Sequence, residues 1–289
     1  MKAYWSDYWA QGYITSFGQD IKGNYTGKLK SCWLEFSEKL KGNSNVLDIG
    51  TGNGALIDLI QKNVSMDLNF TGIDPATINL NTTKYIKGDF LSGVYAEALP
   101  FGNEHFDAVI SQFALEYSDI EVSLKEILRV LKPNGLVQII CHNIDSDIVV
   151  PNIKILDSAI RVKTTMVPIL SDIINAIQKK SDNEAILSAS LNKLINDDKK
   201  INPHAINATL LINFYEFILK NRSIDLNKAF SLFKSELDGL IYRLEDLKSA
   251  ADKNSTVYSL LSELCEIEKV DLIDSNKEKI GSLYKGYKK

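Results

Sequence analysis

Apolar runs alternate with helix-like patterns between residues 44 and 141. An amphipathic pattern with Leu56, Ile57 and Ile60 follows the first run, and another, which we expect Asp119 to cap, precedes the last. Strands separated by helices are typical of a parallel sheet covered on both faces, so we predict an α/β protein. We expect strands at about 45–49, 69–73, 106–111 and 136–141, with a further strand-like stretch leading into 96–101.

The pattern changes after about residue 150, where glycine becomes rare and apolar residues recur at helical spacing. Asn202 and Pro203 are expected to start one helix, as its N-cap and first helical residue. A long apolar stripe from Phe230 to Leu247 favours a helix packed on another helix, within the chain or in a homodimer. The apolar face after Pro203 carries Ile206, Leu210, Phe214, Phe217 and Ile218.

The two ends of the chain carry further patterns. Aromatic residues near the N-terminus fall on one helical face, which is either docked on the main domain or a lid over an active site; the two are compatible. Near the C-terminus, alternating residues 266–273, a turn at Asp274 and a second stretch at 280–287 predict an antiparallel hairpin. The aromatic residues are Tyr4, Trp5, Tyr8, Trp9, Tyr13 and Phe17.

Composition narrows the class of partner. The 289 residues include 33 Lys and Arg and 37 Asp and Glu, so the net charge is −4 and broad nucleic-acid binding is not expected. Cys32, Cys141 and Cys265 form no CxxC pair, which argues against a disulfide framework or a zinc knuckle. The N-terminus lacks the apolar core of a signal peptide, and no apolar run approaches the ~20 residues of a membrane span. We therefore expect a cytoplasmic protein without membrane segments.

The segment most informative about function is a glycine-rich turn after the first strand. Gly50, Gly52 and Ala55 fit a dinucleotide-binding fingerprint, with Asp74 as its distant acid. Asp48, however, ends the strand two residues before Gly50, where a carboxylate accepts a hydrogen bond from an ammonium group that a pyrophosphate lacks. The third glycine, Gly54, completes a D-x-G-x-G-x-G series. Both the dinucleotide and an ammonium-bearing cofactor remain open at this point.

The later segments favour the second alternative. Gly72-Ile73-Asp74, Ala96–Phe101, Phe106–Ser111 and Leu128–Gly135 follow in order. Together with the glycine turn, the series over about residues 44–141 resembles the class I S-adenosylmethionine-dependent methyltransferases, in their small-molecule-methylating branch. The resemblance implies S-adenosylmethionine as cofactor and a Rossmann-like, mostly parallel seven-stranded sheet with helices on both faces.

The resemblance also implies positions for the cofactor. The methionine end is assigned to Asp48, Gly50, Thr51, Gly52 and Gly54, and the ribose to Asp74 and Pro75. The adenine is assigned to Tyr95, Ala96 and Glu97, while Gln112 and Phe113 flank the cofactor and face the substrate. The family usually has an acid where this chain has Tyr95; Asp89 is the other candidate and requires a shifted alignment. The segment between Asp74 and Tyr95 is rich in Asn and Thr, so its usual helix is in doubt.

On this basis we divide the chain into four parts. They are an N-terminal aromatic arm or lid at 1–40, a methyltransferase core at 41–149, a helical insertion at 150–260 and a C-terminal β-hairpin at 261–289. The arm and the insertion are expected to build the acceptor pocket, or the insertion to mediate a homodimer. The candidate substrate-binding residues are Tyr4, Tyr8, Trp9, Tyr13 and Phe17.

Methyl transfer from a sulfonium needs chiefly alignment and exclusion of water, and a general base only when the acceptor holds a proton it does not readily lose. His142, Glu116 and Tyr117, after two of the strands, are the candidate catalytic residues. No metal site is expected, because the acids near His142 match no metal pattern. We predict a small-molecule acceptor. The alternatives are a protein or peptide acceptor, an NAD(P)-dependent oxidoreductase, and a non-catalytic binding or assembly module.

Overall fold

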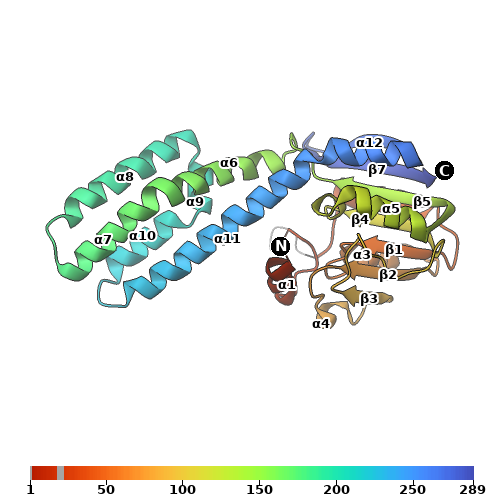
Figure 1. Cartoon of the computed structure of the whole chain (residues 1–289), viewed down its shortest axis with the longest axis horizontal. Helices are drawn as coiled ribbons and strands as arrows, with labels where there is room; N and C mark the ends of the chain where they lie inside the picture. The colour runs from red at the N-terminus through yellow and green to blue at the C-terminus, as the bar shows by residue number, and fades with distance from the viewer. Residues whose placement is uncertain (1, 18–22) are drawn as a thin grey trace. The chain divides into compact units, whose positions relative to one another are not determined.

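A computed structural model describes residues 2–17 and 23–289 of the chain. The chain divides into two compact units, the first formed by residues 1–147 and 249–289 and the second by residues 148–248 (Figure 1). The first unit contains the sheet, and the second is helical. All three cysteines are free and buried.

The sheet has seven strands in the order β3-β2-β1-β4-β5-β7-β6. Neighbours among β1 to β5 pair in parallel, whereas β7 is antiparallel to both β5 and β6. The predicted seven-stranded, mostly parallel α/β sheet with a C-terminal hairpin is therefore confirmed. The strands are β1 (Asn45–Ile49), β2 (Asn69–Asp74), β3 (Asp89–Ser92), β4 (Phe106–Gln112), β5 (Leu131–Cys141), β6 (Cys265–Ile273) and β7 (Lys279–Lys288).

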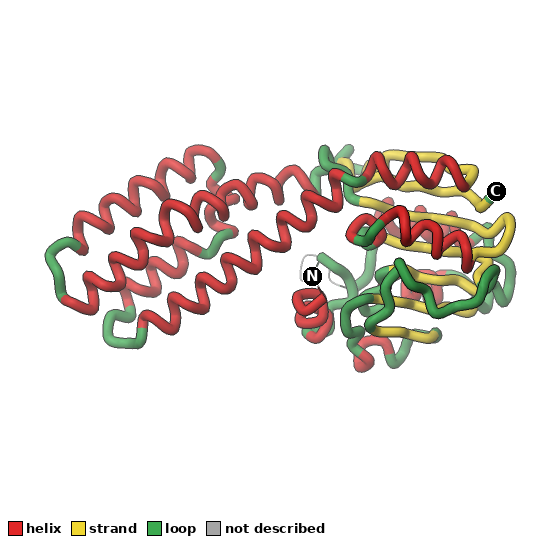
Figure 2. The backbone as a smooth tube through the Cα atoms, in the orientation of Figure 1, coloured by secondary structure: helices red, strands yellow, loops and turns green. Residues whose placement is uncertain are grey.

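Helices cover both faces of this sheet. Helices α5 and α12 pack together with the strands in one cluster, and α2 packs on α3. Figure 2 shows helices both in front of and behind the sheet. The Asp119 carboxylate caps α5 by accepting from the Val122 N–H at 3.3 Å, as predicted. The helices of this unit are α1 (Lys2–Ala10), α2 (Gly27–Ser37), α3 (Ala55–Asn63), α4 (Leu80–Thr83), α5 (Ile120–Val130), a 3₁₀ turn (Leu115–Tyr117) and α12 (Asn254–Leu264).

Alternation along β1 decides which side chains enter which layer. Leu47 and Ile49 pack with Leu124 of α5 and Leu261 of α12 in one buried cluster. Asp48 lies between them in sequence and so points to the opposite face, where it is also buried. Burial of each large aliphatic side chain contributes about 1.5–3 kcal/mol, and this packing holds the acid at the strand end in a defined place.

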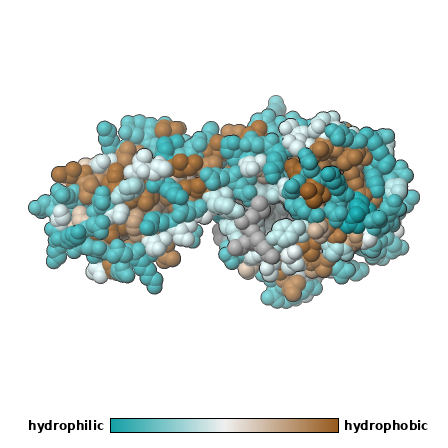
Figure 3. Space-filling view, viewed as in Figure 1, coloured by the Kyte–Doolittle hydropathy of each residue, from teal (hydrophilic) through white to brown (hydrophobic). Residues whose placement is uncertain are grey.

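The second unit consists of helices that share one buried core. Phe230, Phe233, Leu237 and Ile241 of the predicted stripe all belong to this core, so they pack within the chain; the homodimer stays a prediction. Figure 3 shows hydrophobic residues scattered among hydrophilic ones on the visible face of these helices. The helices are α6 (Val149–Arg161), a π-helical turn (Val162–Met166), α7 (Val167–Lys179), α8 (Glu184–Ile201), α9 (Pro203–Ala208), α10 (Leu211–Lys220) and α11 (Leu226–Asp252).

One helical prediction is corrected in this unit. Asn202 caps α9 as expected, accepting from the N–H groups of His204 and Ala205. The helix does not continue through Leu210, which has a φ of 60° and is exposed, not buried. Thr209 produces the break. Its hydroxyl donates to the Ile206 carbonyl oxygen at 2.6 Å and accepts a hydrogen bond from the first backbone N–H of the next helix.

Two boundaries also differ from the expectation. The helical unit ends at Lys248, not near residue 260, because α12 packs on the sheet. Strand β5 starts at Leu131 and contains a bulge, since Phe106 pairs with Leu131 but Ala108 pairs with Leu136. The only helix between Asp74 and Tyr95 is the short α4, in agreement with the doubt about a regular helix there. No helix in residues 2–17 and 23–289 is long and apolar enough to cross a membrane.

The terminal hairpin provides a test of the sheet. A methyl group on Gly286 would overlap the Glu266 carbonyl oxygen on the neighbouring strand, so Gly286→Ala should lower the free energy of unfolding by about 1–3 kcal/mol. The methyl group that Gly239→Ala adds in α11 would have no atom within 4 Å, so this variant should raise the free energy of unfolding by about 0.5–1 kcal/mol. Denaturant melts of both variants measure this, and equal stability of the two would contradict the pairing of β6 with β7.

Candidate functional site

The glycine turn joins β1 to α3 at the carboxyl edge of the sheet. The N–H groups of Gly50 and Thr51 both donate to the Ile73 carbonyl oxygen at 2.9 Å, which fastens the turn to β2. Gly50 and Gly52 have φ angles of 69° and 53°. A Cβ on Gly50 would overlap Ala114, and one on Gly52 would lie 2.5 Å from Cζ2 of Trp9. Both the backbone conformation and the surrounding atoms therefore require glycine.

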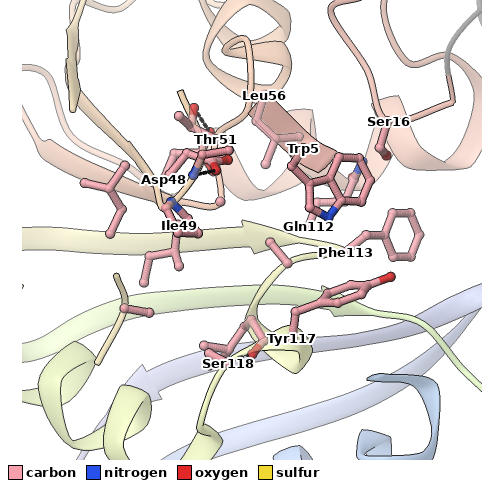
Figure 4. A pocket seen from close by; sticks show the side chains of 18 of the residues that line it. Trp5, Ser16, Asp48, Ile49, Thr51, Leu56, Gln112, Phe113, Tyr117 and Ser118 are labelled. Atoms are coloured by element: carbon pink, nitrogen blue, oxygen red, sulfur yellow. Dashed lines mark hydrogen bonds between the residues drawn. The ribbon is translucent and has the colours of Figure 1, made fainter. Parts of the chain in front are cut away.

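A cavity of about 260 Å³ opens beside this turn (Figure 4). Most of the residues assigned to the cofactor line it; Gly52 and Gly54 do not, and Gly52 lies under the Trp9 ring. The lining consists of Trp5, Trp9, Ile14, Ser16, Tyr25, Asp48, Ile49, Gly50, Thr51, Ala55, Leu56, Ile73, Asp74, Pro75, Ala76, Val94, Tyr95, Ala96, Glu97, Gln112, Phe113, Ala114, Leu115, Tyr117 and Ser118.

Asp48 carries a buried carboxylate oxygen that lacks a hydrogen-bond partner in the described part of the chain. Its Oδ2 accepts from the Thr51 hydroxyl at 2.7 Å, whereas its buried Oδ1 has no hydrogen-bond partner among the described residues. Burial raises the pKa of Asp48 to about 7, and the nearby charge of Asp74 adds to this although Thr51 opposes it. An unpartnered buried oxygen is costly, so the site suits a ligand that brings a hydrogen-bond donor, best of all a cation.

Asp74 ends the neighbouring strand β2. Its two oxygens accept from the N–H groups of Gly52 at 2.9 Å and Ala76 at 2.8 Å. Burial raises its pKa to about 6, although these two hydrogen bonds favour the ionised form. Each carboxylate oxygen retains a further lone pair. The carboxylate is therefore held in place and still able to accept from two hydroxyl groups of a ligand.

The far end of the cavity is formed after β3. Tyr95, Ala96 and Glu97 line it, whereas Asp89 is exposed at the start of β3 and does not. Arg129 supports the next segment by donating to the carbonyl oxygens of Leu99 and Phe101. The ungapped alignment through Tyr95 thus agrees with the cavity better than the shifted one through Asp89.

The N-terminal arm is fastened over the glycine turn. The Asn53 amide donates to the carbonyl oxygens of Trp9 at 3.0 Å and Tyr13 at 2.7 Å. The rings of Trp5 and Trp9 stack at 5.7 Å and both line the cavity. Of the five aromatic residues assigned to substrate, only Trp9 is in the lining; Tyr4, Tyr8, Tyr13 and Phe17 are not. Sequence reasoning missed Trp5, which its i, i+4 spacing to Trp9 would have indicated.

The three candidate catalytic residues occupy two different places. Tyr117 lines the cavity, but Glu116 and His142 do not. Glu116 is fully buried, and its Oε1 accepts from the His142 N–H at 2.8 Å and lies 2.9 Å from Nδ1 of the same residue. The Phe113 ring, which lines the cavity, packs 4.4 Å from the His142 ring. His142 therefore contacts a lining residue and is not itself in the lining.

Other side chains missed by sequence reasoning also belong to the cavity. Tyr25 and Ser16 line it from the segment after α1, and Trp33 of α2 donates from its indole N–H to the Gln112 side chain at 2.7 Å. Nothing local in the sequence signals these contacts. Within residues 2–17 and 23–289, no group of three or more His, Cys, Asp or Glu side chains is arranged to hold a metal ion.

The sequence is similar to known proteins. Residues 47–139 match a family model described as a methyltransferase domain. A demethylmenaquinone methyltransferase of Chlorobaculum tepidum is 32% identical over 96 residues, which are 33% of this chain and 39% of that protein. The ubiquinone/menaquinone biosynthesis C-methyltransferase UbiE of Blochmanniella pennsylvanica is 33% identical over 150 residues, or 52% of this chain and 48% of that protein. The chain thus spans less than half the length of these two curated relatives.

Among solved structures, a SAM dependent methyltransferase from Aquifex aeolicus is 24% identical, with a TM-score of 0.35 over 39% of this chain and 64% of that chain.

The raised pKa of Asp48 predicts a pH-dependent stability. Because its folded pKa of about 7 exceeds the ordinary aspartate value of 3.8, ionised Asp48 destabilises the fold, and the loss of stability develops as the pH rises from about 4 to 7. Asp48→Asn should therefore raise the free energy of unfolding above pH 7, by at most about 4 kcal/mol, and have little effect near pH 4.

Asp107→Asn is the control of opposite sign. Partial burial raises the pKa of Asp107, but hydrogen bonds from Lys132 and the Asn45 N–H outweigh burial and lower it. This variant should lose stability at neutral pH, and the loss should shrink as the pH falls. Thermal melts across pH measure both variants, and a pH-independent effect of Asp48→Asn would contradict the raised pKa.

Proposed function

We propose that this chain, whose residues 47–139 form a class I S-adenosylmethionine-dependent methyltransferase domain, transfers the methyl group of that cofactor to a small, uncharged acceptor. The observation that carries the proposal is the unpartnered Oδ1 of Asp48 in the cavity beside the glycine turn. The ammonium of a methionine moiety supplies the donor that this oxygen lacks.

The residues of the cavity suit the rest of the cofactor. The Asp74 carboxylate is available to the two ribose hydroxyls, and Tyr95, Ala96 and Glu97 are available to the adenine. When bound, the sulfonium supplies a reactive methyl group. The chain's own part is then to hold an acceptor in line with that group and to exclude water.

The acceptor side of the cavity supports an uncharged substrate. Trp5, Phe113 and Tyr117 contribute aromatic surface there (Figure 4). Asp48, Asp74 and Glu97 are acidic, and the described lining includes no Lys, Arg or His. A phosphate or carboxylate on the acceptor would find no opposite charge among these side chains. The names of the relatives point to quinone-type acceptors, a class that such a lining accommodates.

Catalysis on this proposal rests mainly on alignment and desolvation. Tyr117 is the candidate that lines the acceptor side, whereas Glu116 and His142 act on it through the rings that His142 contacts, Phe113 and Tyr117. A hydroxyl acceptor would require a base, and a carbon or amine acceptor that readily loses its proton would not. We propose that the Glu116–His142 pair positions the Phe113 wall of the acceptor side.

The alternatives have less support. An oxidoreductase would place a dinucleotide pyrophosphate beside the unpartnered Asp48 oxygen, which is a repulsive arrangement. A protein or peptide acceptor and a non-catalytic assembly role have no specific observation in their favour.

Calorimetric titration with S-adenosylhomocysteine and with NAD tests the cofactor. The wild type should bind S-adenosylhomocysteine and not NAD, and Asp48→Asn should weaken the binding by about 10- to 100-fold, because a charge-assisted hydrogen bond is lost. Asp107→Asn, which lies at the start of β4, is the matched control and should bind normally. Binding of NAD alone would overturn the proposal.

The same titration should depend on pH. An ammonium beside Asp48 favours its ionised form, so binding below the free pKa of about 7 must release a proton. Affinity for S-adenosylhomocysteine should therefore fall by up to about tenfold per pH unit below pH 7 and level off above it. Titrations in buffers of different ionisation enthalpy measure the released proton. Asp48→Asn should release fewer protons; an unchanged number would assign the release to another group.

A further inference from the structure

Two buried polar atoms of opposite character are left without partners in the same cavity. Among the described residues, the buried side-chain atoms without a hydrogen-bond partner are Thr15 Oγ1, Asp48 Oδ1, Gln112 Nε2 and Glu116 Oε2. Only Asp48 and Gln112 line the cavity. One is an acceptor and the other a donor, so together they call for a ligand with a donor and an acceptor close together.

Trp33 determines which end of the Gln112 amide faces the cavity. The Trp33 indole N–H donates to Gln112 Oε1 at 2.7 Å, and both residues are buried. An indole N–H can only donate, so the amide oxygen must face Trp33 and the amide nitrogen must point elsewhere. The orientation of the Gln112 amide is thus set by its neighbour, and Nε2 is left to serve a ligand.

The unpartnered donor and acceptor belong to one corner of the cavity. Strands β1 and β4 pair side by side, with Asp48 opposite Ile110, so Asp48 and Gln112 lie near the ends of adjacent strands and on the same face of the sheet. The Tyr25 hydroxyl lies close enough to Asp48, Ser16 and the Gln112 amide for all three to act on its pKa. Burial is the largest effect and raises that pKa to about 12, so the hydroxyl keeps its proton near neutral pH.

We propose that the Gln112 amide nitrogen, with the Tyr25 hydroxyl, binds the α-carboxylate of the cofactor's amino-acid end while Asp48 binds its ammonium. An α-amino acid carries a donor and an acceptor on adjacent atoms, as this corner requires. A carboxylate beside the acidic side chains of this cavity needs donors, and the described lining offers neutral ones in place of Lys or Arg. Trp33 is a positioning residue that acts through Gln112. This inference rests on the proposed function.

The test compares two ligands that differ in the amino-acid end. S-adenosylhomocysteine carries it, and 5′-methylthioadenosine lacks it. Gln112→Leu should weaken binding of S-adenosylhomocysteine by about 10- to 100-fold and leave binding of 5′-methylthioadenosine unchanged, because only the first ligand brings a carboxylate. Trp33→Phe should cause a smaller loss with the same selectivity, since it frees the amide to rotate.

Gln138→Leu is the matched control. Gln138 is also a buried glutamine, but its amide donates to the Cys32 carbonyl oxygen at 3.0 Å and it does not line the cavity. This variant should alter stability without changing the ratio of the two affinities. If Gln112→Leu does not fold, Gln112→Glu keeps an oxygen for Trp33 and replaces the donor by a negative charge. It should lose S-adenosylhomocysteine selectively.

The outcomes separate this inference from the proposed function. A wild type that binds neither ligand overturns the methyltransferase proposal itself. A wild type that binds both, with Gln112 variants that weaken both ligands equally or neither, overturns the carboxylate subsite and leaves the proposed function standing.

Discussion

The carboxyl edge of the sheet is organised around Asp48, a buried carboxylate with one oxygen that has no hydrogen-bond partner in the described structure. Leu47 and Ile49 pack against α5 and α12, and side chains alternate along a strand, so Asp48 points to the opposite face of the sheet. Thr51 satisfies one oxygen, and the second is left facing the cavity. The turn that follows donates hydrogen bonds to the Ile73 carbonyl oxygen, which holds its glycines in a fixed position beside the acid. Stability is given up at this point for a buried, unpartnered acceptor of the kind that suits a cation.

The N-terminal arm and α2 complete what the sheet edge begins. Asn53, inside the glycine turn, holds the arm by its Trp9 and Tyr13 carbonyl groups. Trp33 reaches from α2 to the end of β4 and orients Gln112. The contacts that hold the arm and α2 are thus made by backbone carbonyls and neutral side chains. The charged side chains of the described lining are all acids. Such an environment favours a cationic cofactor and an uncharged partner for it.

The fold was predictable where a local pattern leads to one structure. The apolar runs became β1, β2, β4 and β5 of a mostly parallel sheet, and Asn202 and Asp119 cap helices as their side chains indicate. The prediction was wrong where it relied only on the helical spacing of apolar residues. The helical period continues across Leu210, but the Thr209 hydroxyl competes for the backbone and breaks the helix. Periodicity likewise does not tell what α12 packs on, so the end of the helical unit was placed too late.

By itself, the sequence determined the strand ends that carry Asp48 and Asp74 and the glycine turn between β1 and α3, because strand period and turn chemistry act over a few residues. Only the tertiary structure decided which side chains surround these acids. Trp33 and Gln112 are 79 residues apart, and their contact depends on how α2 packs on the sheet. The same packing leaves His142 behind Phe113 and sets Trp5 in the cavity wall. Long-range contacts of this kind leave no local pattern to read.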